Sequence, residues 1–464
     1  MTIPKADLLA GDEVLSAEEI LSLDDRIFDP GTRPSIETAL ALSSGMVAGL
    51  HVPFASGTFD HHEDVAEQKL FHCLFGRDSL IISSLLRQQN ANLQINTVCA
   101  LAAFQGQGFN PVSEEEPGRI AHEVRDLDDP QAARIAAESG WQFPYYGSVD
   151  ATLLWLIALD EITQNDASIL DRQIGGQSLS ERAELAATWV MSRLENDSGY
   201  VRSKRANPKG ILNQVWKDSG DSYLTHDGRV ATSPGTVSAE TVAQTFDALL
   251  AASRLTKLSS HRWQITPSEF ATTAQQVRQN LLDSWWLGDR FAMGLGLIDE
   301  KEVMLDAIAS NQWRLLDSEI LSVPEAKAFV TQLADSVTDA EILGPNGIRT
   351  LGKSNPRYRP GGYHTGSSWP MDTALIVRGL LKHDAKTEAA EVASKTIRAI
   401  ESVGAYPELF RSDESEKLGV SRFVIDVRDA QLGTSNRICQ PPQLLQGWTI
   451  AAYSWLIQQQ FGGK

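Results

Sequence analysis

The chain has 464 residues, 42% of them hydrophobic, which is the composition of a globular protein that can bury a substantial core. Its formal net charge of −19 repels a nucleic-acid backbone and an anionic membrane surface, so we expect neither as a partner. A small uncharged ligand is compatible with this charge. The three cysteines, Cys73, Cys99 and Cys439, are too few and too scattered for a disulfide framework or a zinc site, and we expect no metal and no other cofactor.

The N-terminal segment 1–13 has a single lysine, early acidic residues and no long apolar run, so it matches neither a secretory signal nor a membrane anchor. We therefore predict a cytoplasmic protein with buried, reduced thiols. Segment 60–64 contains two histidines and three acidic residues, but without a regular ligand spacing it favours a surface charge cluster over a metal site.

The predicted elements are helices. Apolar residues recur at the three- and four-residue spacing of amphipathic helices over residues 35–50, 78–104, 148–163, 179–195, 238–256, 267–285, 324–335, 369–382, 387–402 and 446–460. Between them lie long segments rich in Gly, Pro, Asp and aromatic residues, such as 106–129, 196–234 and 344–370. Connections are typically only about 4 to 6 residues long, and longer ones tend to carry function.

The same pattern decides the fold class. There is neither an extended series of alternating strand patterns nor a low-complexity linker, so we predict one all-α domain over 1–464, with 1–35 as an extension. About a dozen helices with elaborated connections suit an (α/α)6 barrel, a double ring of helices whose loops on one face form a central pocket. A helical solenoid is the alternative, but solenoids have a fixed sequence period and none is present.

Two motifs in the first half of the chain precede predicted helices. Arg77 and Asp78 either offer a donor and an acceptor for sugar hydroxyls, or are a solvated cation and a helix cap. Segment 141–150 places four aromatic residues in six positions, which exceeds what helix capping explains. Segment 361–372 has the same character, because a Gly-rich turn with aromatics again leads into a helix.

The segment around Asp218 places a tryptophan, Trp216, two residues before the acid and between two turns. One interpretation is a solvated turn in which Asp218 or Asp221 caps the next element. Trp216 favours the other interpretation, because tryptophan is a poor choice for an exposed turn but a good platform for the apolar face of a sugar ring.

Glu408 follows a proline and stands between apolar residues, just after a predicted helix. It is either a fixed, partly buried carboxylate or an ordinary residue at a helix exit. Together, Asp218 and Glu408 supply what hydrolysis of a glycosidic bond requires. One protonated carboxyl gives a proton to the leaving oxygen, and one ionised carboxylate acts on the opposite face.

Seven blocks carry a resemblance to a known family. In order they are Phe75–Leu80, His122–Arg125, Phe143–Thr152, Asn213–Ser222, Tyr363–Leu375, Pro407–Phe410 and Cys439–Trp448. They resemble the glucosidase domain of bacterial and archaeal glycogen-debranching enzymes, the amylo-α-1,6-glucosidase family. The resemblance implies an (α/α)6 catalytic barrel and exo-acting hydrolysis of α-glucosides with inversion.

The resemblance also implies roles for individual residues. Asp218 matches the general acid, Glu408 the general base, and Arg77 and Asp78 the ligands of the sugar at the nonreducing end. The same blocks contain the other candidate substrate-binding residues: Glu123, Tyr145, Tyr146, Asp150, Trp216, Lys217, His364, Trp369 and Asp372.

Three departures from the family favour a small α-glucoside over a branched polymer. The chain begins almost directly with the expected barrel, whereas debranching enzymes usually carry a β-rich domain ahead of it. The family's Glu-x-Gln element is not present as such, and Glu240 and Gln244 stand in its place. The insertion 411–437 is expected to wall off the pocket.

We therefore expect a metal-independent, inverting, exo-acting α-glycosidase, an α-glucosidase whose partner is a small-molecule α-glucoside such as an oligosaccharide or a glucosylated solute. Asp218 would be protonated and Glu408 ionised, with their carboxyl groups roughly 6.5 to 9.5 Å apart to leave room for a water. A homo-oligomer is left open.

Three rival functions remain open at this point. A glycoside phosphorylase on the same barrel would need no general base, which Glu408 argues against. A sugar epimerase or isomerase would use histidine bases, for which His72, His122, His226 and His364 are candidates. A noncatalytic carbohydrate-binding protein is the third, although it would be expected to have lost one carboxylate.

Overall fold

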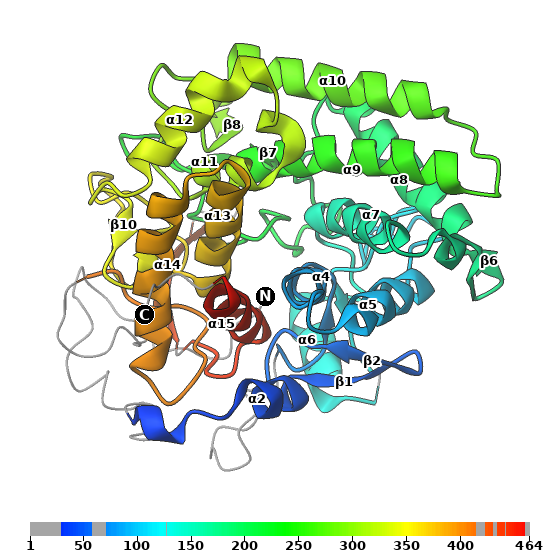
Figure 1. The fold of residues 1–464 in the computed structure, drawn as a ribbon, viewed down its shortest axis with the longest axis horizontal. Helices are drawn as coiled ribbons and strands as arrows, with labels where there is room; N and C mark the ends of the chain where they lie inside the picture. Colours follow the sequence, from blue (N-terminus) through cyan, green and yellow to red (C-terminus); the bar gives the residue numbers. More distant parts are fainter. Residues whose placement is uncertain are drawn as a thin grey trace. The chain divides into compact units, whose positions relative to one another are not determined.

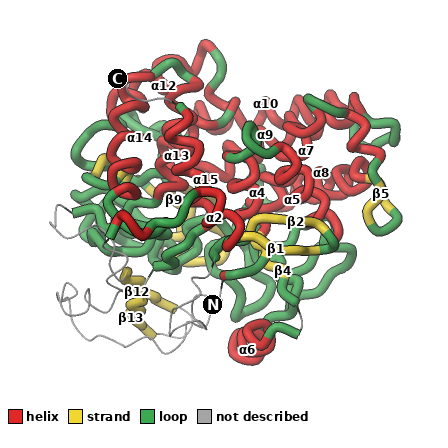
Figure 2. The backbone as a smooth tube through the Cα atoms, turned by 60° about the horizontal axis from the view of Figure 1, so that its bottom comes forward, coloured by secondary structure: helices red, strands yellow, loops and turns green. Residues whose placement is uncertain are grey.

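The chain is described by a computed structural model that forms two compact units. The first unit contains Ala41–Trp216 and Glu240–Trp285, and the second contains Lys217–Ala239 with the described residues of 3–40 and 286–464. The residues that the structure describes are 29–57, 71–126, 128–413, 423–429, 434–440 and 442–459. Helices dominate the described residues, and the strands form sheets of only two or three strands (Figure 2).

The first unit is built mainly from helices. Its elements are β1 (Ser44–Val47), β2 (Leu50–Pro53), β3 (Leu74–Phe75), α4 (Gly76–Leu85), α5 (Ala91–Ala103), β4 (Glu123–Val124), α6 (Pro130–Ser139), α7 (Asp150–Thr163), the 3₁₀ helix η4 (Ala167–Asp171), β5 (Gln173–Ile174), β6 (Gln177–Ser178), α8 (Leu179–Asn196), α9 (Ala239–Leu258) and α10 (Pro267–Ser284). Helix α4 packs against α5 and α7 (Figure 1). Trp155, Leu156, Phe246 and Phe270 lie in the core of this unit.

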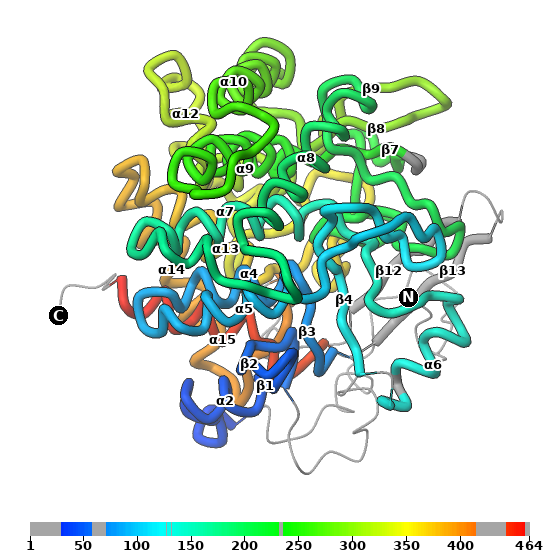
Figure 3. The backbone as a smooth tube through the Cα atoms, turned by 90° about the vertical axis from the view of Figure 1, so that its right-hand side faces the viewer, coloured from blue at the N-terminus to red at the C-terminus, as the bar shows by residue number. Residues whose placement is uncertain are grey.

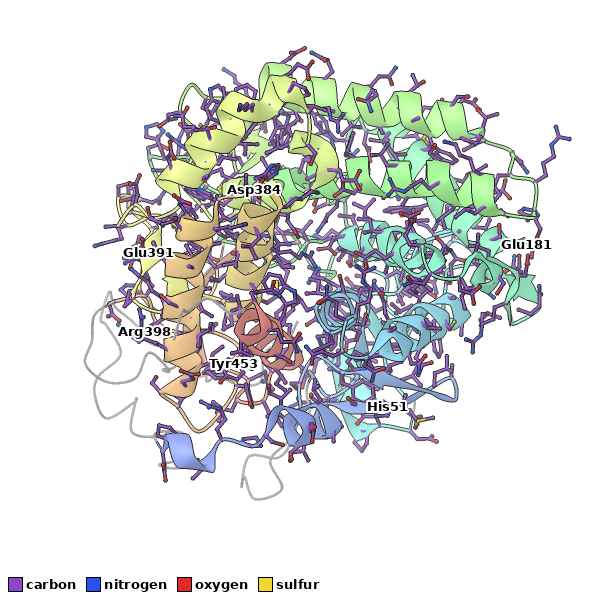
Figure 4. The ribbon with its side chains drawn as sticks, viewed as in Figure 1. His51, Glu181, Asp384, Glu391, Arg398 and Tyr453 are labelled. Atoms are coloured by element: carbon purple, nitrogen blue, oxygen red, sulfur yellow. The ribbon has the colours of Figure 1, made fainter. Side chains whose placement is uncertain are left out.

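Local sequence determines where these helices begin. Ser178 and Glu181 form a capping box at the start of α8, where Glu181 is labelled in Figure 4, and Thr266 and Glu269 form another at α10. Each box satisfies backbone N–H groups that have no partner within the helix. Helix α4, in contrast, is buried along almost its whole length, so packing and not an amphipathic pattern stabilises it.

The second unit has the same mixture of helices and short strands. Its elements are the 3₁₀ helix η2 (Pro30–Thr32), β7 (Thr232–Ser238), β8 (Gly294–Ile298), β9 (Lys301–Leu305), α11 (Asn311–Arg314), the 3₁₀ helices η5 (Leu315–Asp317), η6 (Glu319–Leu321) and η7 (Pro324–Ala326), α12 (Lys327–Ser336), β10 (Leu343–Gly344), β11 (Gly347–Ile348), α13 (Pro370–Lys382), α14 (Lys386–Glu401), β12 (Phe423–Asp429), β13 (Thr434–Gln440) and α15 (Gly447–Gln458). Helix α2 (Ile36–Leu42) spans the boundary between the two units.

Helices α13, α14 and α15 pack against one another in the second unit (Figure 1). Helix α14 shows why: Val392 and Ile400 face the core, whereas Glu391 and Arg398 lie on the exposed face labelled in Figure 4. Strands β7, β8 and β9 form an antiparallel sheet (Figure 3). The amphipathic pattern therefore selects the packed face of a helix that lies at the surface.

The all-α class is confirmed, and most predicted helices are present within a few residues of their expected ends. The helix predicted over 35–50 is wrong after residue 42, because β1 and β2 form a hairpin there. Ala48 and Gly49 both have positive φ angles, 51° and 75°, which suit the tight turn of a hairpin and end a helix. The helix predicted over 78–104 is two helices, α4 and α5. The structure adds α6 and α11, while a single domain over 1–464 stays a prediction.

Candidate active site

The turn that carries Asp218 is anchored in the core of the second unit. Lys217 is 0% exposed, and its Nζ donates to Asn311 Oδ1 at 2.6 Å and to the Thr350 carbonyl at 2.8 Å. Ser219 is also buried, whereas Asp218 is half-buried. This turn is therefore not a solvated loop. The buried ammonium of Lys217 holds the backbone next to Asp218, so its predicted role as a substrate ligand stays a prediction.

The hydroxyl of Ser219 links this turn to His364. Ser219 Oγ lies 2.9 Å from His364 Nδ1, 2.8 Å from Asp221 Oδ1 and 2.6 Å from Ser222 Oγ. The Ser222 hydroxyl donates to the Ser219 carbonyl at 2.7 Å. All four side chains are buried. The residue that follows Asp218 is thus held by a polar network inside the protein.

Glu408 is buried, at 5% exposure, and both of its carboxylate oxygens accept hydrogen bonds. The Tyr363 hydroxyl donates to Oε1 at 2.6 Å, and the backbone N–H of Gln443 donates to Oε2 at 3.2 Å. The backbone N–H of Glu408 in turn donates to the Gln443 carbonyl at 2.8 Å. Glu408 is therefore a fixed, buried group and not an exposed residue at a helix exit.

Tyr363 and His364 connect the two predicted catalytic segments of the second unit. Tyr363 donates to Glu408, while the adjacent His364 contacts Ser219, the neighbour of Asp218. The Tyr363 and His364 rings lie 4.4 Å apart. A pair of 2.8 Å backbone hydrogen bonds between residues 368 and 410 holds this loop against the Glu408 segment. One dipeptide thus contacts both the Glu408 carboxylate and the residue that follows Asp218 in the chain.

Trp369 and Asp372 follow this dipeptide in the chain and are both buried. Trp369 is 1% exposed, its ring stacks on His364 at 5.2 Å, and its Nε1 donates to the Tyr363 carbonyl at 2.9 Å. Asp372 is 0% exposed and accepts from Arg314 Nη1 at 2.9 Å. Trp369 therefore supports the loop from within the core, whereas Asp372 pairs with a residue of α11. Their predicted contact with substrate stays a prediction.

In the first unit, Arg77 and Asp150 form a buried ion pair between the first turns of α4 and α7. Arg77 Nε lies 2.7 Å from Asp150 Oδ2, and each side chain is 4% exposed. The Ser148 hydroxyl donates to the other oxygen of Asp150 at 2.6 Å. Asp78 is buried too, and since the cap residue of α4 is Phe75, Asp78 is not the helix cap. Arg77 is not solvated either.

A second buried ion pair joins Glu123 and Arg125 in the same unit. Strand β4 positions Glu123 by pairing it with Phe75, the residue that precedes α4. Burial raises the pKa of the Glu123 carboxyl, and the Arg125 guanidinium beside it offsets part of that shift. The ion pair is expected to hold Glu123 rigidly beside the start of α4.

His122 lies beside this pair and is 3% exposed. Its ring packs edge-on against Phe75 at 5.4 Å and Tyr145 at 6.0 Å, and its Nδ1 has no hydrogen-bond partner among the described residues. Burial, followed by the positive charges of Arg77 and Arg119, lowers the pKa of His122 well below its usual range. His122 is therefore a neutral imidazole at ordinary pH.

The aromatic residues predicted as sugar contacts in the first unit pack inside it. Tyr145 is 0% exposed, stacks on Trp141 at 4.0 Å, and its hydroxyl donates to Glu114 Oε1 at 2.7 Å. Tyr146 is 4% exposed and donates to the carbonyl of Phe104, the residue that follows α5. Trp216 is 4% exposed as well. Their role in binding sugar stays a prediction, because this packing leaves little of their surface open.

Comparison with known proteins decides the family. Residues 141–424 match the model of the mannosylglycerate hydrolase MGH1-like glycoside hydrolase domain. The chain belongs to this glycoside hydrolase family. A search of curated proteins finds no significant match.

Solved structures of similar fold are found as well. A GH63 mannosylglycerate hydrolase from Thermus thermophilus, in complex with Tris, has a TM-score of 0.61 at 13% identity, covering 92% of this chain and 100% of that one. The same enzyme with Tris and D-glycerate has a TM-score of 0.58 at 12% identity, covering 92% of this chain and 99% of that one. An uncharacterized conserved protein from the same organism has a TM-score of 0.54 at 13% identity, covering 92% and 100%.

These findings confirm the predicted (α/α)6 fold and the predicted glycoside hydrolase class. The resemblance to the glycogen-debranching family is not confirmed, because the model that matches is that of the MGH1-like family. The sequence blocks therefore identified the type of enzyme, and the debranching specificity stays a prediction.

Sequence reasoning missed two residues that organise the MGH1-like chain. Tyr363 binds Glu408, although only its membership of a matching block singled it out. Glu114 is 1% exposed and accepts from Gln214 Nε2 at 2.6 Å, while Arg119 donates to the same amide group at 2.7 Å. Glu114 opens a run of three acidic residues, which is typical of a solvated loop, so nothing in the local pattern indicates its burial.

A surface cavity of about 580 Å³ lies between α8 and α10 of the first unit. Its lining includes Met191, Leu194 and Val277 and none of the predicted site residues. This cavity therefore does not coincide with the candidate chemistry.

Several predictions concern groups other than the carboxylates. Over the ranges given above, no group of three or more His, Cys, Asp or Glu side chains is arranged to hold a metal ion, and no helix combines the length and apolarity of a membrane span. Cys73 and Cys99 are free buried thiols, and burial raises the pKa of both. The cluster at 60–64, the Cys439 side chain and much of the insertion 411–437 lie outside the described residues, although β12 and β13 pair antiparallel within the insertion.

Proposed function

We propose that the protein is an inverting α-glycosidase that hydrolyses a small α-glycoside, with Asp218 as general acid and Glu408 as general base. The observation that carries this proposal is the Tyr363–His364 dipeptide, which contacts Glu408 on one side and the Asp218 turn on the other within one unit. Hydrolysis with inversion needs such a pair of carboxyl groups, set roughly 6.5 to 9.5 Å apart so that a water fits between them and the sugar.

Asp218 is suited to the role of acid because it is half-buried while both neighbours in the chain are buried. Its carboxyl group can therefore meet a substrate while its backbone stays fixed. In the reaction, Asp218 gives its proton to the glycosidic oxygen as the bond between that oxygen and the anomeric carbon breaks. The alcohol leaves with this proton, and Asp218 becomes a carboxylate.

Glu408 is suited to the role of base because hydrogen bonds orient its carboxylate. The Tyr363 hydroxyl donates to one carboxylate oxygen and the Gln443 N–H to the other. Glu408 takes a proton from a water whose oxygen bonds to the anomeric carbon from the opposite face. The released sugar has the inverted configuration, and exchange with solvent returns both carboxyl groups to their starting states.

For the substrate, we propose a sugar in α-linkage to a small hydroxy acid such as glycerate, with glucose as the sugar. The aglycone comes from relatives named as mannosylglycerate hydrolases, and the sugar from the α-glucosidase resemblance of the sequence blocks. Amylo-α-1,6-glucosidase activity on a branched polymer is the less favoured specificity. A cytoplasmic location, a small-molecule partner and the absence of a nucleic-acid or membrane partner stay part of this proposal.

The test is a substrate panel followed by NMR. It contains α-glucosylglycerate, α-mannosylglycerate, α-glucosylglycerol, maltose, isomaltose and glycogen, each with and without inorganic phosphate. We expect fastest release of free sugar from α-glucosylglycerate, with the β-anomer appearing first in the spectrum. The α-anomer as first product would exclude the single-displacement mechanism. Sugar 1-phosphate formed only with phosphate would make the protein a phosphorylase, and glycogen cleaved as fast as the best small glycoside would restore the debranching function.

A further inference from the structure

Ser219 is the centre of a buried hydrogen-bond network next to the proposed acid. Its hydroxyl contacts the carboxylate of Asp221, the hydroxyl of Ser222 and the imidazole of His364, at 2.8, 2.6 and 2.9 Å. The four side chains are between 1% and 8% exposed. Polar groups at this depth are costly unless they are bonded to each other, so each of the four side chains depends on its partners in the network.

Counting protons determines which way His364 bonds. Ser219 has a single hydroxyl proton, which it donates to the Asp221 carboxylate. Ser219 Oγ therefore accepts from His364, so His364 carries a proton on Nδ1. The free imidazole can place its single proton on either nitrogen, and here the hydrogen bond selects one of them.

The same count of protons argues against a nucleophilic role for Ser219. In a serine nucleophile the histidine removes the hydroxyl proton, and a carboxylate orients the histidine from its other nitrogen. Here the serine stands between the carboxylate and the imidazole, and the imidazole donates to it. Ser219 is therefore not activated as a nucleophile by His364.

Two aromatic neighbours hold the ring of His364 in place. Trp369 stacks on it at 5.2 Å with an interplanar angle of 23°, and Tyr363 lies against it at 4.4 Å. A donor fixed in this way restrains the Ser219 hydroxyl, and with it the peptide unit next to Asp218. On the opposite side of Asp218, Lys217 is anchored by Asn311.

We propose that His364 is a positioning residue for the general acid: through Ser219 it fixes the turn that aims the Asp218 carboxyl at the leaving oxygen. The proposal rests on the function proposed above. Misplacement of a catalytic group by about 1 Å can cost about 10²-fold in rate. That loss should fall on substrates whose leaving group needs a proton.

The experiment compares two substrates of the same sugar, the best glycoside of the panel and the glycosyl fluoride, because fluoride departs with little help from an acid. In His364→Phe, kcat for the glycoside should fall roughly 10- to 100-fold, while kcat for the fluoride should stay near that of wild type. His364→Asn, which retains an N–H donor near the Nδ1 position, should recover most of the loss. Ser412→Ala, which removes a buried hydroxyl bonded to Tyr358 in the same unit, is the control.

Asp218→Asn separates the two proposals. This variant should lower kcat for the glycoside much more than kcat for the fluoride. Equal losses on both substrates would refute Asp218 as the acid. Suppose that Asp218→Asn shows the selective loss. If His364→Phe then lowers kcat equally for the glycoside and the fluoride, or leaves both unchanged, His364 does not position the acid.

A spectroscopic measurement keeps the proposal testable if His364→Phe does not fold. In the wild-type protein labelled with ¹⁵N-histidine, the His364 nitrogens should show the Nδ1–H tautomer, and Ser219→Ala should change that signature and cause the same glycoside-selective loss. An Nε2–H tautomer in the wild type would overturn the proposed network, as would a Ser219→Ala enzyme with unchanged kcat.

Discussion

Two carboxylates of the first unit, Asp150 and Glu123, and one of the second, Glu408, are held by different means. In the first, Asp150 is paired with the Arg77 guanidinium at 2.7 Å, and Glu123 is paired with Arg125. In the second, Glu408 accepts from a phenol hydroxyl and a backbone N–H. A guanidinium keeps its charge at any ordinary pH, so it holds the carboxylate bonded to it in one position at any such pH. Neutral donors orient a carboxylate and still allow it to gain a proton.

This difference matches the two kinds of work that a glycosidase must do. Binding a sugar needs rigid donors and acceptors whose charge does not change during the reaction. Proton transfer needs groups that change their charge in each turnover. We therefore expect the paired carboxylates of the first unit to contribute mainly to stability and binding, and Glu408 to contribute mainly to turnover. The following changes test this comparison.

The largest effect is expected for the two proposed proton carriers. Asp218→Asn and Glu408→Gln each remove a transferable proton with almost no change in volume, so kcat should fall roughly 10²- to 10⁴-fold. Steady-state kinetics measures this, and thermal unfolding should show nearly wild-type stability. Asp227→Asn and Glu401→Gln make the same chemical changes at exposed positions and should retain activity. Wild-type turnover in Asp218→Asn or Glu408→Gln would contradict the assignment.

Breaking a buried ion pair should have a large effect on folding stability. Asp150→Asn leaves the positive charge of Arg77 buried without its counter-charge, which typically costs about 3 to 5 kcal/mol of folding stability. Asp289→Asn removes the partner of Arg290 at the surface and should cost at most about 1 kcal/mol. Denaturant unfolding of both variants checks this. If Asp150→Asn proves as stable as Asp289→Asn, the Arg77–Asp150 pair does not stabilise the fold.

The sequence indicated the two proposed proton carriers, but not the contacts that hold them. Asp218 and Glu408 stand in short blocks with recognisable neighbours, so their positions were predictable. The Tyr363–Glu408 bond joins residues far apart in the chain, and no local pattern encodes such a contact. Trp216 and Trp369 illustrate another limit, because an aromatic residue beside an acid has the same sequence whether it faces a sugar or the core.

Fold prediction failed where backbone conformation overrode side-chain pattern. Residues 44–50 have apolar residues at helical spacing, but the left-handed turn at Ala48 and Gly49 makes them a hairpin. The burial of Glu114 was missed for a different reason. Its neighbours in sequence are acidic and suggest solvent, whereas Tyr145 and Gln214 bind its carboxylate inside the first unit. Burial of a charge depends on partners that the local sequence does not show.

An intermediate effect is expected when one neutral donor is removed from Glu408. Tyr363→Phe deletes a hydrogen bond to a carboxylate, worth about 1.5 to 3 kcal/mol, so kcat should fall roughly 10- to 100-fold with a smaller change in KM. Tyr358→Phe removes a hydroxyl that bonds Ser412 and is the control. A fall in Tyr363→Phe that is confined to KM would instead make Tyr363 a substrate ligand.

The smallest effect tests the first unit through pH. His122 has a lowered pKa in the folded protein, so it contributes stability above its unfolded pKa near 6.5, and that stability is lost as pH falls toward the folded pKa. His122→Phe keeps an aromatic ring against Phe75 and sacrifices no hydrogen bond at Nδ1. Between pH 7.5 and pH 5, the wild type should therefore lose more stability than the variant, by up to about 1.4 kcal/mol per pH unit, the limit for one proton. Calorimetry across this range measures the difference. Substitution of the exposed His226 controls for the removal of a histidine as such. Equal pH dependence in wild type and His122→Phe would show that the buried imidazole takes up its proton without opening the unit.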